Sequence, residues 1–381
     1  MYISKNLKKF LIMPSHNTQP EWEKYREHAL ATITPMLEKL GFELEHEQPH
    51  IGGERYLMQA VTTASGTKLI LLGRRKKDNR RVVIKVTRDP NGIRELAHER
   101  TCRAALTDIS FAYQIFSSPE EILFTEQDGY TISVQAFIEQ ERQFLERPLE
   151  KQFSLILRAF KAQEGAHATT YAHKCFVTKT FGSMDASGYL ASYQTFQKQT
   201  SIHPLTSEHV RVMLHSGGDM LGKNHETIER YSGFLTHTDF VPHNFRIAGG
   251  KIYLLDHSSL RFGNKYEGWA RFLNFMTLYN RPLEKALLFY VRNNRTEEEM
   301  ISLKLMRIYR LGELIWYHTD KLEKTSGDLH TLTKKRVEFW TSVLEALLHN
   351  TLVSEEIVRE YKKIRDALRS PEERKRQKGL H

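Results

Sequence analysis

The hydrophobic pattern of this sequence changes close to residue 138, and this change constrains the fold more than any other feature. Before it, short apolar runs alternate with turn-like segments such as TTASGT and KKDN. After it, apolar residues recur mostly at spacings of three and four. The first pattern is typical of strands and the second of helices. We therefore expect an α+β fold with a sheet-rich N-terminal lobe over residues 1–138 and a helical C-terminal lobe over residues 139–381.

The expected N-terminal lobe opens with a helix and continues with five strands. Thr18 and Glu21 match a capping box and Gly41 can end the helix, which we expect over residues 21–40. The expected strands span residues 56–61, 68–74, 81–87, 122–126 and 130–138, with a helix over residues 92–106 between the third and the fourth.

The expected C-terminal lobe is mostly helical. Thr296 and Glu299 form a second capping box, which opens a helix. A short hairpin is expected within residues 233–262, with AGGK as its turn. Helices are expected over residues 149–165, 207–222, 331–350 and 354–369, and through most of the chain after residue 269.

Lys85 lies inside the apolar run VVIKV, where a cation is costly unless an anion accompanies it. Strand alternation places Val83 and Lys85 on one face. The opposite face then carries Val82, Ile84 and Val86. Glu95 and Glu99 lie four residues apart on the following helix, so both are candidate partners. We prefer Glu99, because its longer spacing suits a turn followed by a helix.

A second polar group lies in the segment HTDFVPHN, residues 237–244, and at the end of the next apolar strand, Asp256. A carboxylate at a loop tip, here Asp239, can orient a hydroxyl group and accept its proton. Asn244 and Asp256 supply an amide oxygen and a carboxylate, the hard ligands that Mg²⁺ prefers. The hairpin between them brings the end of one strand beside the start of the other. The spacing matches the kinase catalytic-loop pattern H-R-D-x-x-x-x-N followed by a metal-binding Asp, so we expect a magnesium-dependent site for phosphoryl transfer.

Three alternatives apply to residues in or near this segment. One alternative is a transition-metal site built from imidazole and carboxylate groups, namely those of His237, Asp239, His243 and His257. An aromatic group fits the core better than a cage for a cationic substrate, with the members Tyr266, Trp269, Phe272 and Phe275. Met184 and Asp185 lie in a segment that precedes residues 237–244, here called the catalytic loop, and are candidates to line the pocket of the accepting molecule.

The spacing H-x-D-x-x-x-x-N followed by a strand that ends in Asp resembles the aminoglycoside phosphotransferase and choline kinase-like family, which shares the protein-kinase fold. The resemblance implies a small antiparallel-sheet lobe, a larger helical lobe, and ATP and Mg²⁺ bound between them. It implies transfer of the γ-phosphoryl group to a hydroxyl of a small molecule. The implied roles are base for Asp239, support of the loop for His237, Mg²⁺ ligands for Asn244 and Asp256, phosphate binding for Lys85 with Glu99 behind it, adenine contact for Val83, and a phosphate-covering turn at Gly66.

The sequence also departs from that family. Thr238 stands where a glycine is usual, and Asp256 is followed by His257 and Ser258 rather than an aromatic residue. No glycine-rich loop and no Ala-Pro-Glu segment are present. These departures disfavour a regulated protein kinase and leave ATP against GTP open. The remaining alternatives are a kinase-fold nucleotide-binding protein without turnover and a kinase that acts on protein or RNA.

The charge balance bears on possible partners. The chain has 56 Lys and Arg against 46 Asp and Glu, a formal net charge of +10. The excess is concentrated in residues 359–381 and in a cluster over residues 74–81. Such stretches are usually solvated faces, so nucleic acid is an unlikely partner, although the basic C-terminal tail leaves it open. No apolar run reaches the length of a membrane span and no signal peptide is expected. Two cysteines, Cys102 and Cys175, suit a cytoplasmic location.

Overall fold

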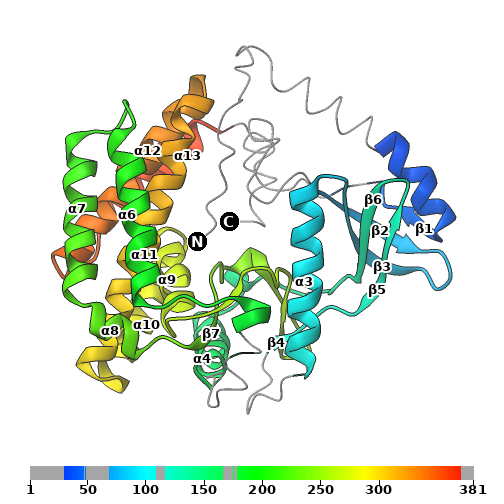
Figure 1. Ribbon diagram of the computed structural model, residues 1–381, viewed down its shortest axis with the longest axis horizontal. Helices are drawn as coiled ribbons and strands as arrows, with labels where there is room; N and C mark the ends of the chain where they lie inside the picture. The colour runs from blue at the N-terminus through cyan, green and yellow to red at the C-terminus, as the bar shows by residue number, and fades with distance from the viewer. Residues whose placement is uncertain are drawn as a thin grey trace.

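The computed structural model describes residues 30–46, 48, 68–108, 116–165, 175 and 178–369. They form two lobes, a small one built on an antiparallel sheet and a larger helical one (Figure 1). The expected α+β fold with two unequal lobes is confirmed. The predicted strand over residues 56–61, the turn with Gly66, the start of the leading helix and the end of the C-terminal tail lie outside the described residues.

The sheet of the small lobe has five antiparallel strands in the order β1-β2-β3-β6-β5. Their bounds are β1 Phe42–Leu44, β2 Leu69–Arg75, β3 Arg80–Thr87, β6 Tyr130–Ala136 and β5 Glu121–Gln127. Residues 30–39 form a helix, and Gly41 follows it with φ +84°, as expected for the glycine that ends a helix. Ile33 and Leu37 of this helix pack against Val82 and Ile84 of β3 in one apolar cluster.

Helix α3, Pro90–Asp108, lies on the opposite side of the sheet and faces the large lobe (Figure 1). Alternation along β3 therefore has two consequences. Val82, Ile84 and Val86 are buried beneath the leading helix, at 0–1% exposure. Val83 and Lys85 point to the side of α3 and the cleft, as the sequence predicts.

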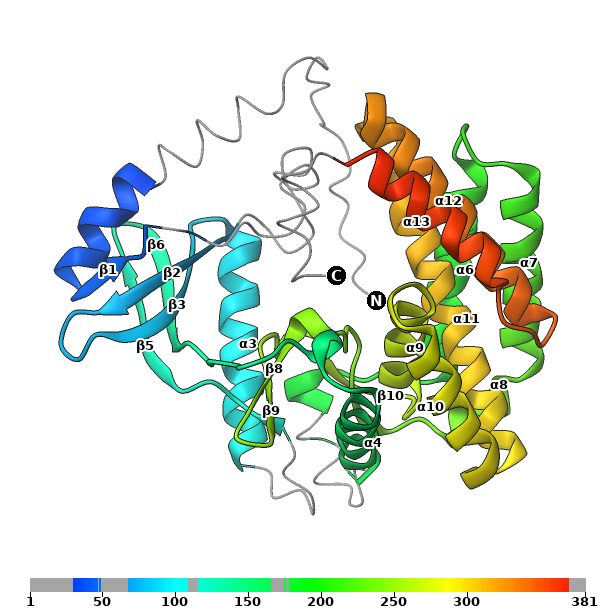
Figure 2. The same ribbon diagram turned by 180° about the vertical axis from the view of Figure 1, so that it is seen from behind.

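The large lobe consists of helices around one continuous apolar core. Their bounds are α4 Leu149–Gly165, α6 Ala186–Ile202, α7 Glu208–Lys223, α8 His225–Arg230, α9 Glu267–Tyr279, α10 Arg281–Asn294, α11 Glu297–Asp320, α12 Gly327–Leu348 and α13 Glu355–Ala367. Helix α11 packs against α6, α9 and α12, and α13 crosses α12 (Figure 2). The capping box of Thr296 and Glu299 forms as expected.

Short strands lie between the sheet lobe and the helices. β8 (Phe245–Ala248) and β9 (Lys251–Leu254) form the expected hairpin, whose turn residues Gly249 and Gly250 have φ of +54° and +72°. β4 (Phe116–Ser117) adds a parallel edge to this hairpin. β7 (Phe234–His237) pairs with β10 (Leu260–Gly263). In Figure 2 the hairpin lies between α3 and α4.

Candidate active site

Lys85 and Glu99 form a buried ion pair at the cleft. Both carboxylate oxygens of Glu99 lie 2.7 Å from Lys85 Nζ, and the two side chains are 12% and 4% exposed. Lys85 Nζ also donates to the carbonyl oxygen of Leu255 at 3.3 Å. A buried ammonium group needs such partners to offset its lost hydration. The pair therefore connects the sheet, α3 and the residue that precedes Asp256.

Glu95, the alternative partner, instead pairs with Lys68 at the start of β2. Both ion pairs border a cavity of about 300 Å³ between the lobes. Val83, Asn244 and Asp256 line the same cavity. The structure thus gathers residues from β3, α3 and the β8–β9 hairpin around one space, although Lys85 and Leu255 are 170 positions apart in sequence. Gly66 lies outside the described residues.

Asp239 is held on both carboxylate oxygens. Asn244 Nδ2 donates to Asp239 Oδ2 at 2.7 Å and to the Asp239 carbonyl oxygen at 2.8 Å. Arg271, on α9, donates from Nε to Asp239 Oδ1 at 2.7 Å. The Asp239 side chain is still 34% exposed. A fixed carboxylate that solvent can reach is suited to orienting a hydroxyl group.

The charges around Asp239 decide its protonation state. Burial by itself would raise the pKa of this carboxyl group, but Arg271, His243 and Arg310 lower it by more. The pKa of Asp239 is therefore held well below its usual value of 3.8. The group is a carboxylate throughout the neutral range, as a proton acceptor requires.

Asp256 closes the cavity from the hairpin side. Its Oδ1 accepts from the backbone N–H and the hydroxyl of Ser258, at 3.0 and 2.6 Å, and its Oδ2 accepts from Ser259 Oγ at 2.6 Å. Burial opposes ionisation of Asp256, but His237, both serines and Lys85 bring its pKa below the usual value. The carboxylate is thus ionised and oriented.

His237 supports this loop rather than facing the cavity. Its ring is fully buried, and Nε2 lies 2.7 Å from the carbonyl oxygen of Asp256. Thr238, the residue in place of the usual glycine, donates from its backbone N–H and its hydroxyl to the Ser259 carbonyl oxygen, at 2.8 and 3.1 Å. The two residues therefore tie the loop of Asp239 to the loop of Asp256.

The residues after Asp256, which differ from the expected family pattern, have clear structural roles. His257 Nε2 lies 2.7 Å from Ser118 Oγ, beside β4. Burial, reinforced by nearby cations, lowers the pKa of His257 to about 3, so its ring is neutral at pH 7. Ser258 and Ser259 hold the Asp256 carboxylate, as described above. An aromatic residue is therefore not needed to fix this loop.

Two contacts of Asn244 indicate how Asn244 and Asp256 would hold Mg²⁺. Asn244 directs Nδ2 to Asp239, which leaves Oδ1 as the atom that a cation would use. The Leu255 backbone N–H donates to the Asn244 carbonyl oxygen at 2.9 Å. Because Asp256 is the next residue after Leu255, this bond places Asp256 near Asn244. One amide oxygen and one carboxylate are a donor set that fits Mg²⁺, which keeps several waters and phosphate oxygens as its other ligands.

Sequence reasoning missed several residues that shape the site. Arg271 holds Asp239 from 32 positions away, through the packing of α9. Arg246 lines the cavity directly after the catalytic loop, and burial lowers its pKa. Arg271 is a lone cation in a helix of apolar residues, GWARFLNF, which is the one local signal. Arg246 and Lys68 carry no signal, because cations at strand ends are ordinary.

The structure also bears on the other interpretations of these residues. Among the described residues, no group of three or more His, Cys, Asp or Glu side chains is arranged to hold a metal ion. Asp185 caps α6 by accepting from the Gly188 backbone N–H at 2.8 Å, and neither it nor Met184 is among the described residues that line the cavity between the lobes. The aromatic group is core, as expected, with exposures of 0–5% for Tyr266, Trp269, Phe272 and Phe275.

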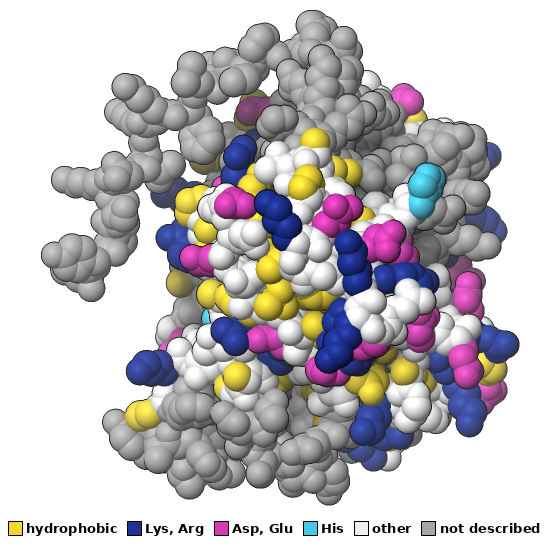
Figure 3. Space-filling model, turned by 90° about the vertical axis from the view of Figure 1, so that its right-hand side faces the viewer, with side chains coloured by type: hydrophobic (Ala, Val, Ile, Leu, Met, Phe, Trp, Pro, Cys, Tyr) yellow, Lys and Arg dark blue, Asp and Glu magenta, His cyan; other side chains and the backbone are white. Residues whose placement is uncertain are grey.

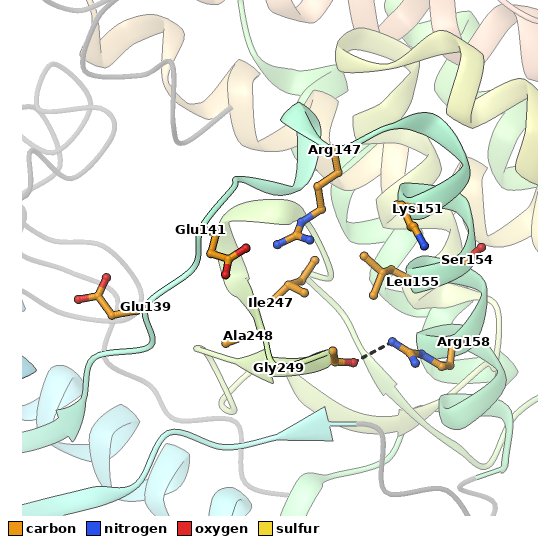
Figure 4. Close-up of a pocket in the computed structure, with 11 residues that line it drawn as sticks. Glu139, Glu141, Arg147, Lys151, Ser154, Leu155, Arg158, Ile247, Ala248 and Gly249 are labelled. Atoms are coloured by element: carbon orange, nitrogen blue, oxygen red, sulfur yellow. Dashed lines mark hydrogen bonds between the residues drawn. The ribbon is translucent and has the colours of Figure 1, made fainter.

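Two further cavities adjoin the β8–β9 hairpin and the catalytic loop. The larger, of about 640 Å³, lies beside the hairpin turn and α4 (Figure 4). It combines Glu139 and Glu141 with basic residues of α4, and Arg158 donates to the Gly250 carbonyl oxygen at 2.8 Å. The smaller, of about 260 Å³, lies among α9, α11, α12 and α13 and is lined by His243 and Arg271.

The basic cluster at the β2–β3 turn is largely paired. Arg75 pairs with Asp78, Arg80 with Glu120, and Arg81 with Glu45 and Glu139. On the face of the sheet lobe, basic and acidic side chains are interspersed (Figure 3). This pattern supports a solvated face over a polyanion-binding patch. Cys102 and Cys175 are both free. Within the described part of the chain, no helix is long and apolar enough to cross a membrane.

Comparison with known proteins finds similar structures but no similar sequence. No protein-family model matches the sequence, and no curated protein matches it. The apo form of a thermostable mutant of aminoglycoside phosphotransferase APH(4)-Ia has a TM-score of 0.55 at 14% identity, over 83% of this chain and 97% of that one. Macrolide 2'-phosphotransferase MphH from Brachybacterium faecium has a TM-score of 0.53 at 11% identity, over 81% and 98%. Aminoglycoside 2'-phosphotransferase-IIIa, in its GDP complex, has a TM-score of 0.58 at 11% identity, over 82% and 97%.

These similarities confirm the fold that the sequence motifs indicate. The chain has the kinase-like fold of aminoglycoside and macrolide phosphotransferases. At 11–14% identity the comparison carries the fold and not the activity.

Proposed function

We propose that the protein is a small-molecule kinase that transfers the γ-phosphoryl group of ATP to a hydroxyl group. The observation that carries this proposal is the convergence of Lys85, Glu99, Asn244 and Asp256 on one cavity. Asp239 is hydrogen-bonded to Asn244 beside that cavity. Each contact has a role in phosphoryl transfer. Solved structures with the same fold support it, because APH(4)-Ia forms ternary complexes with hygromycin B and either ADP or AMP-PNP.

In this proposal the residues position and neutralise charge. Lys85, held by Glu99, binds the phosphate oxygens of ATP, and Val83 packs against the adenine ring. Asn244 Oδ1 and Asp256 hold Mg²⁺, which neutralises charge on the phosphate oxygens when bound. Asp239, fixed by Arg271 and Asn244, orients the acceptor hydroxyl and takes its proton. Most of the rate enhancement then comes from positioning and electrostatics.

The alternatives have less support. In a nucleotide-binding protein without turnover we expect at least one of these groups to be absent or misdirected, whereas the set is complete here. A kinase acting on protein or RNA rests on the basic C-terminal tail, whose end lies outside the described residues. Deleting residues 370–381 without loss of activity would remove that support. A division between lobes at residues 138 and 139, and a cytoplasmic location, belong to the same proposal.

The proposal is tested by measuring Mg-ATP binding and ATP turnover separately. In Lys85→Ala we expect Mg-ATP affinity to fall about tenfold or more, because a charge-assisted contact to phosphate is lost. In Asp239→Asn we expect affinity within a few-fold of wild type and turnover abolished, because only the proton acceptor changes. Lys285→Ala serves as the control, since this lysine is exposed and pairs with Glu355 away from the cleft. Unchanged binding in Lys85→Ala, or lost binding in Asp239→Asn, would overturn these roles.

A further inference from the structure

The cavity among α9, α11, α12 and α13 has an unusual composition. Four arginines line it, Arg271, Arg336, Arg365 and Arg369, and among the described residues no aspartate or glutamate does. Its other walls are largely aromatic, with Phe275, Tyr279, Tyr317, Trp340 and Tyr361. Guanidinium groups favour phosphate and carboxylate, and aromatic faces favour planar or apolar bodies. The lining therefore matches an anion attached to an apolar group.

The position of this cavity connects it to the candidate active site. Arg271 lines the cavity and donates to Asp239 Oδ1 at 2.7 Å. His243 lines both this cavity and the cavity of about 300 Å³ between the lobes, which we call the nucleotide cavity. A molecule bound here lies one side chain from the proposed base and beside the proposed nucleotide site. Asp239 itself does not line the cavity, so an acceptor bound here has to extend its hydroxyl group past Arg271 to reach that carboxylate.

Within the part of the chain that the structure describes, not all of these arginines have a counter-ion. Arg271 is paired with Asp239, and Arg365 Nε donates to Asp366 at 2.8 Å. Arg369, by contrast, is 8% exposed, and its buried Nε has no hydrogen-bond partner. Nη1 of Arg365 is also buried without a partner. A buried guanidinium with unused donors is costly, and an anionic ligand would satisfy it.

The electrostatics of Arg369 agree with this geometry. Burial lowers the pKa of Arg369, and neighbouring Arg365 lowers it further. Tyr279, Tyr361 and Asp366 act in the opposite direction without restoring the usual value. Burial likewise lowers the pKa of Arg336. Burial also disfavours the charged form of Arg365, but Asp366 and nearby tyrosines raise its pKa. Four arginines thus face the cavity, and the carboxylates paired with them are Asp239 and Asp366.

We propose that this cavity is the acceptor site, and that its acceptor is a small molecule that carries a phosphate or carboxylate group on an aromatic or apolar body. The inference rests on the proposed function, whose acceptor it specifies. The volume of about 260 Å³ fits a compact metabolite, since it lies just below the range of typical ligand pockets, roughly 300–1,000 Å³. An aminoglycoside carries cationic amino groups, which four arginines would repel.

The test is calorimetric titration of the full-length protein with four probes. Phenyl phosphate and benzoate supply the two anionic groups on an aromatic ring, benzylamine supplies a cation on the same ring, and hygromycin B supplies a large polycation. We expect one or both anions to bind and neither cation to bind. Failure of both anions to bind, or equal binding of benzylamine, would overturn the proposal. The stronger of the two anions identifies the anionic group.

Variants locate the binding and separate the two proposals. In Arg369→Gln we expect the affinity for the bound anion to fall about tenfold, because a charge-assisted contact is lost. Arg365→Gln is the second variant, and Arg359→Gln, on an exposed position of α13, is the matched control. Unchanged affinity in both pocket variants would overturn the proposal. Thermal unfolding of each unliganded variant checks that it is folded.

Lys85→Ala separates this cavity from the nucleotide cavity. We expect it to lose Mg-ATP affinity while anion binding persists, and loss of anion binding in Lys85→Ala would place the anion at Lys85 and overturn the inference. Mg-ATP binding without anion binding would refute the acceptor class and leave the proposed function standing. Anion binding to a protein that does not bind Mg-ATP would refute the proposed function, and with it the acceptor role.

Discussion

Lys85 occupies an apolar strand with 12% of its side chain exposed, a place that an ammonium group takes only with a partner. Local sequence was enough to predict the strand, its two faces and the need for an anion on the next helix. That Asn244 and Asp256 lie close together was likewise predictable, because a short hairpin joins them. Arg271 was not, because its contact with Asp239 arises from the packing of α9 against the catalytic loop.

His318 provides a prediction at the same scale. Burial, followed by Arg271 and Lys321, lowers its pKa from 6.5 to about 4. Between these values the unfolded chain binds a proton that the folded protein does not, so the free energy of unfolding falls as pH drops from about 6.5 towards 4. We expect this histidine to contribute about 1–2 kcal/mol of that loss at pH 5, by linkage discounted for partial exposure.

The measurement compares wild type with His318→Gln by urea unfolding at pH 7.5 and pH 5. The variant lacks the titrating ring, so its free energy of unfolding should fall by less between the two pH values. Parallel losses in the two proteins would contradict the lowered pKa of His318. The lowered pKa values of Asp239 and Asp256 act at more acidic pH and do not enter this window.

At the scale of elements, helices and strands with a clear local hydrophobic pattern were predicted, and a helix whose buried face carries polar groups was missed. The hairpin with AGGK and the helix over 149–165 were predicted within a residue or two. Helix α6 was missed, because its buried face includes Tyr189, Tyr193 and Thr200, which simple hydrophobicity does not mark. Tyr189 hydroxyl donates to Glu267 at 2.7 Å, so this face is stabilised by hydrogen bonds as well as by packing. Strand β1 has three residues, too few for a pattern.

Strand β3 allows the same substitution to be made on both of its faces. Val82 is fully buried under the leading helix, whereas Val83 lines the nucleotide cavity. We expect Val82→Ala to lower the free energy of unfolding by about 2 kcal/mol through lost burial and a residual cavity, with Mg-ATP affinity unchanged. Val83→Ala should cost less than about 1 kcal/mol of stability and weaken Mg-ATP binding several-fold.

Chemical denaturation and nucleotide titration of both valine variants check this expectation. The two variants serve as controls for each other, since the side-chain change is identical and only the face differs. Equal losses of stability in both variants, or weaker Mg-ATP binding in Val82→Ala, would contradict the assignment of the faces.

At the scale of the whole molecule, two lobes with different periodicity meet at a cleft, and this arrangement was predictable from the change in pattern near residue 138. The fold shared with aminoglycoside and macrolide phosphotransferases agrees with it. The composition of the cavity among α9, α11, α12 and α13 was not predictable from the sequence. Its arginines come from α9, α12, α13 and the residues after α13, which become neighbours only when the helices pack.

The central claim is that Asp256 holds Mg²⁺ for a nucleotide bound between the lobes. Thermal unfolding of wild type and Asp256→Ala, with ATP or GTP and with or without Mg²⁺, tests this claim most directly. A ligand that binds only the folded protein at ~100 times its Kd adds about 2.7 kcal/mol of stability. We predict a Mg²⁺-dependent rise in Tm for wild type with one of the nucleotides, and its loss in Asp256→Ala. No rise with either nucleotide, or an equal Mg²⁺-dependent rise in the variant, would contradict the account.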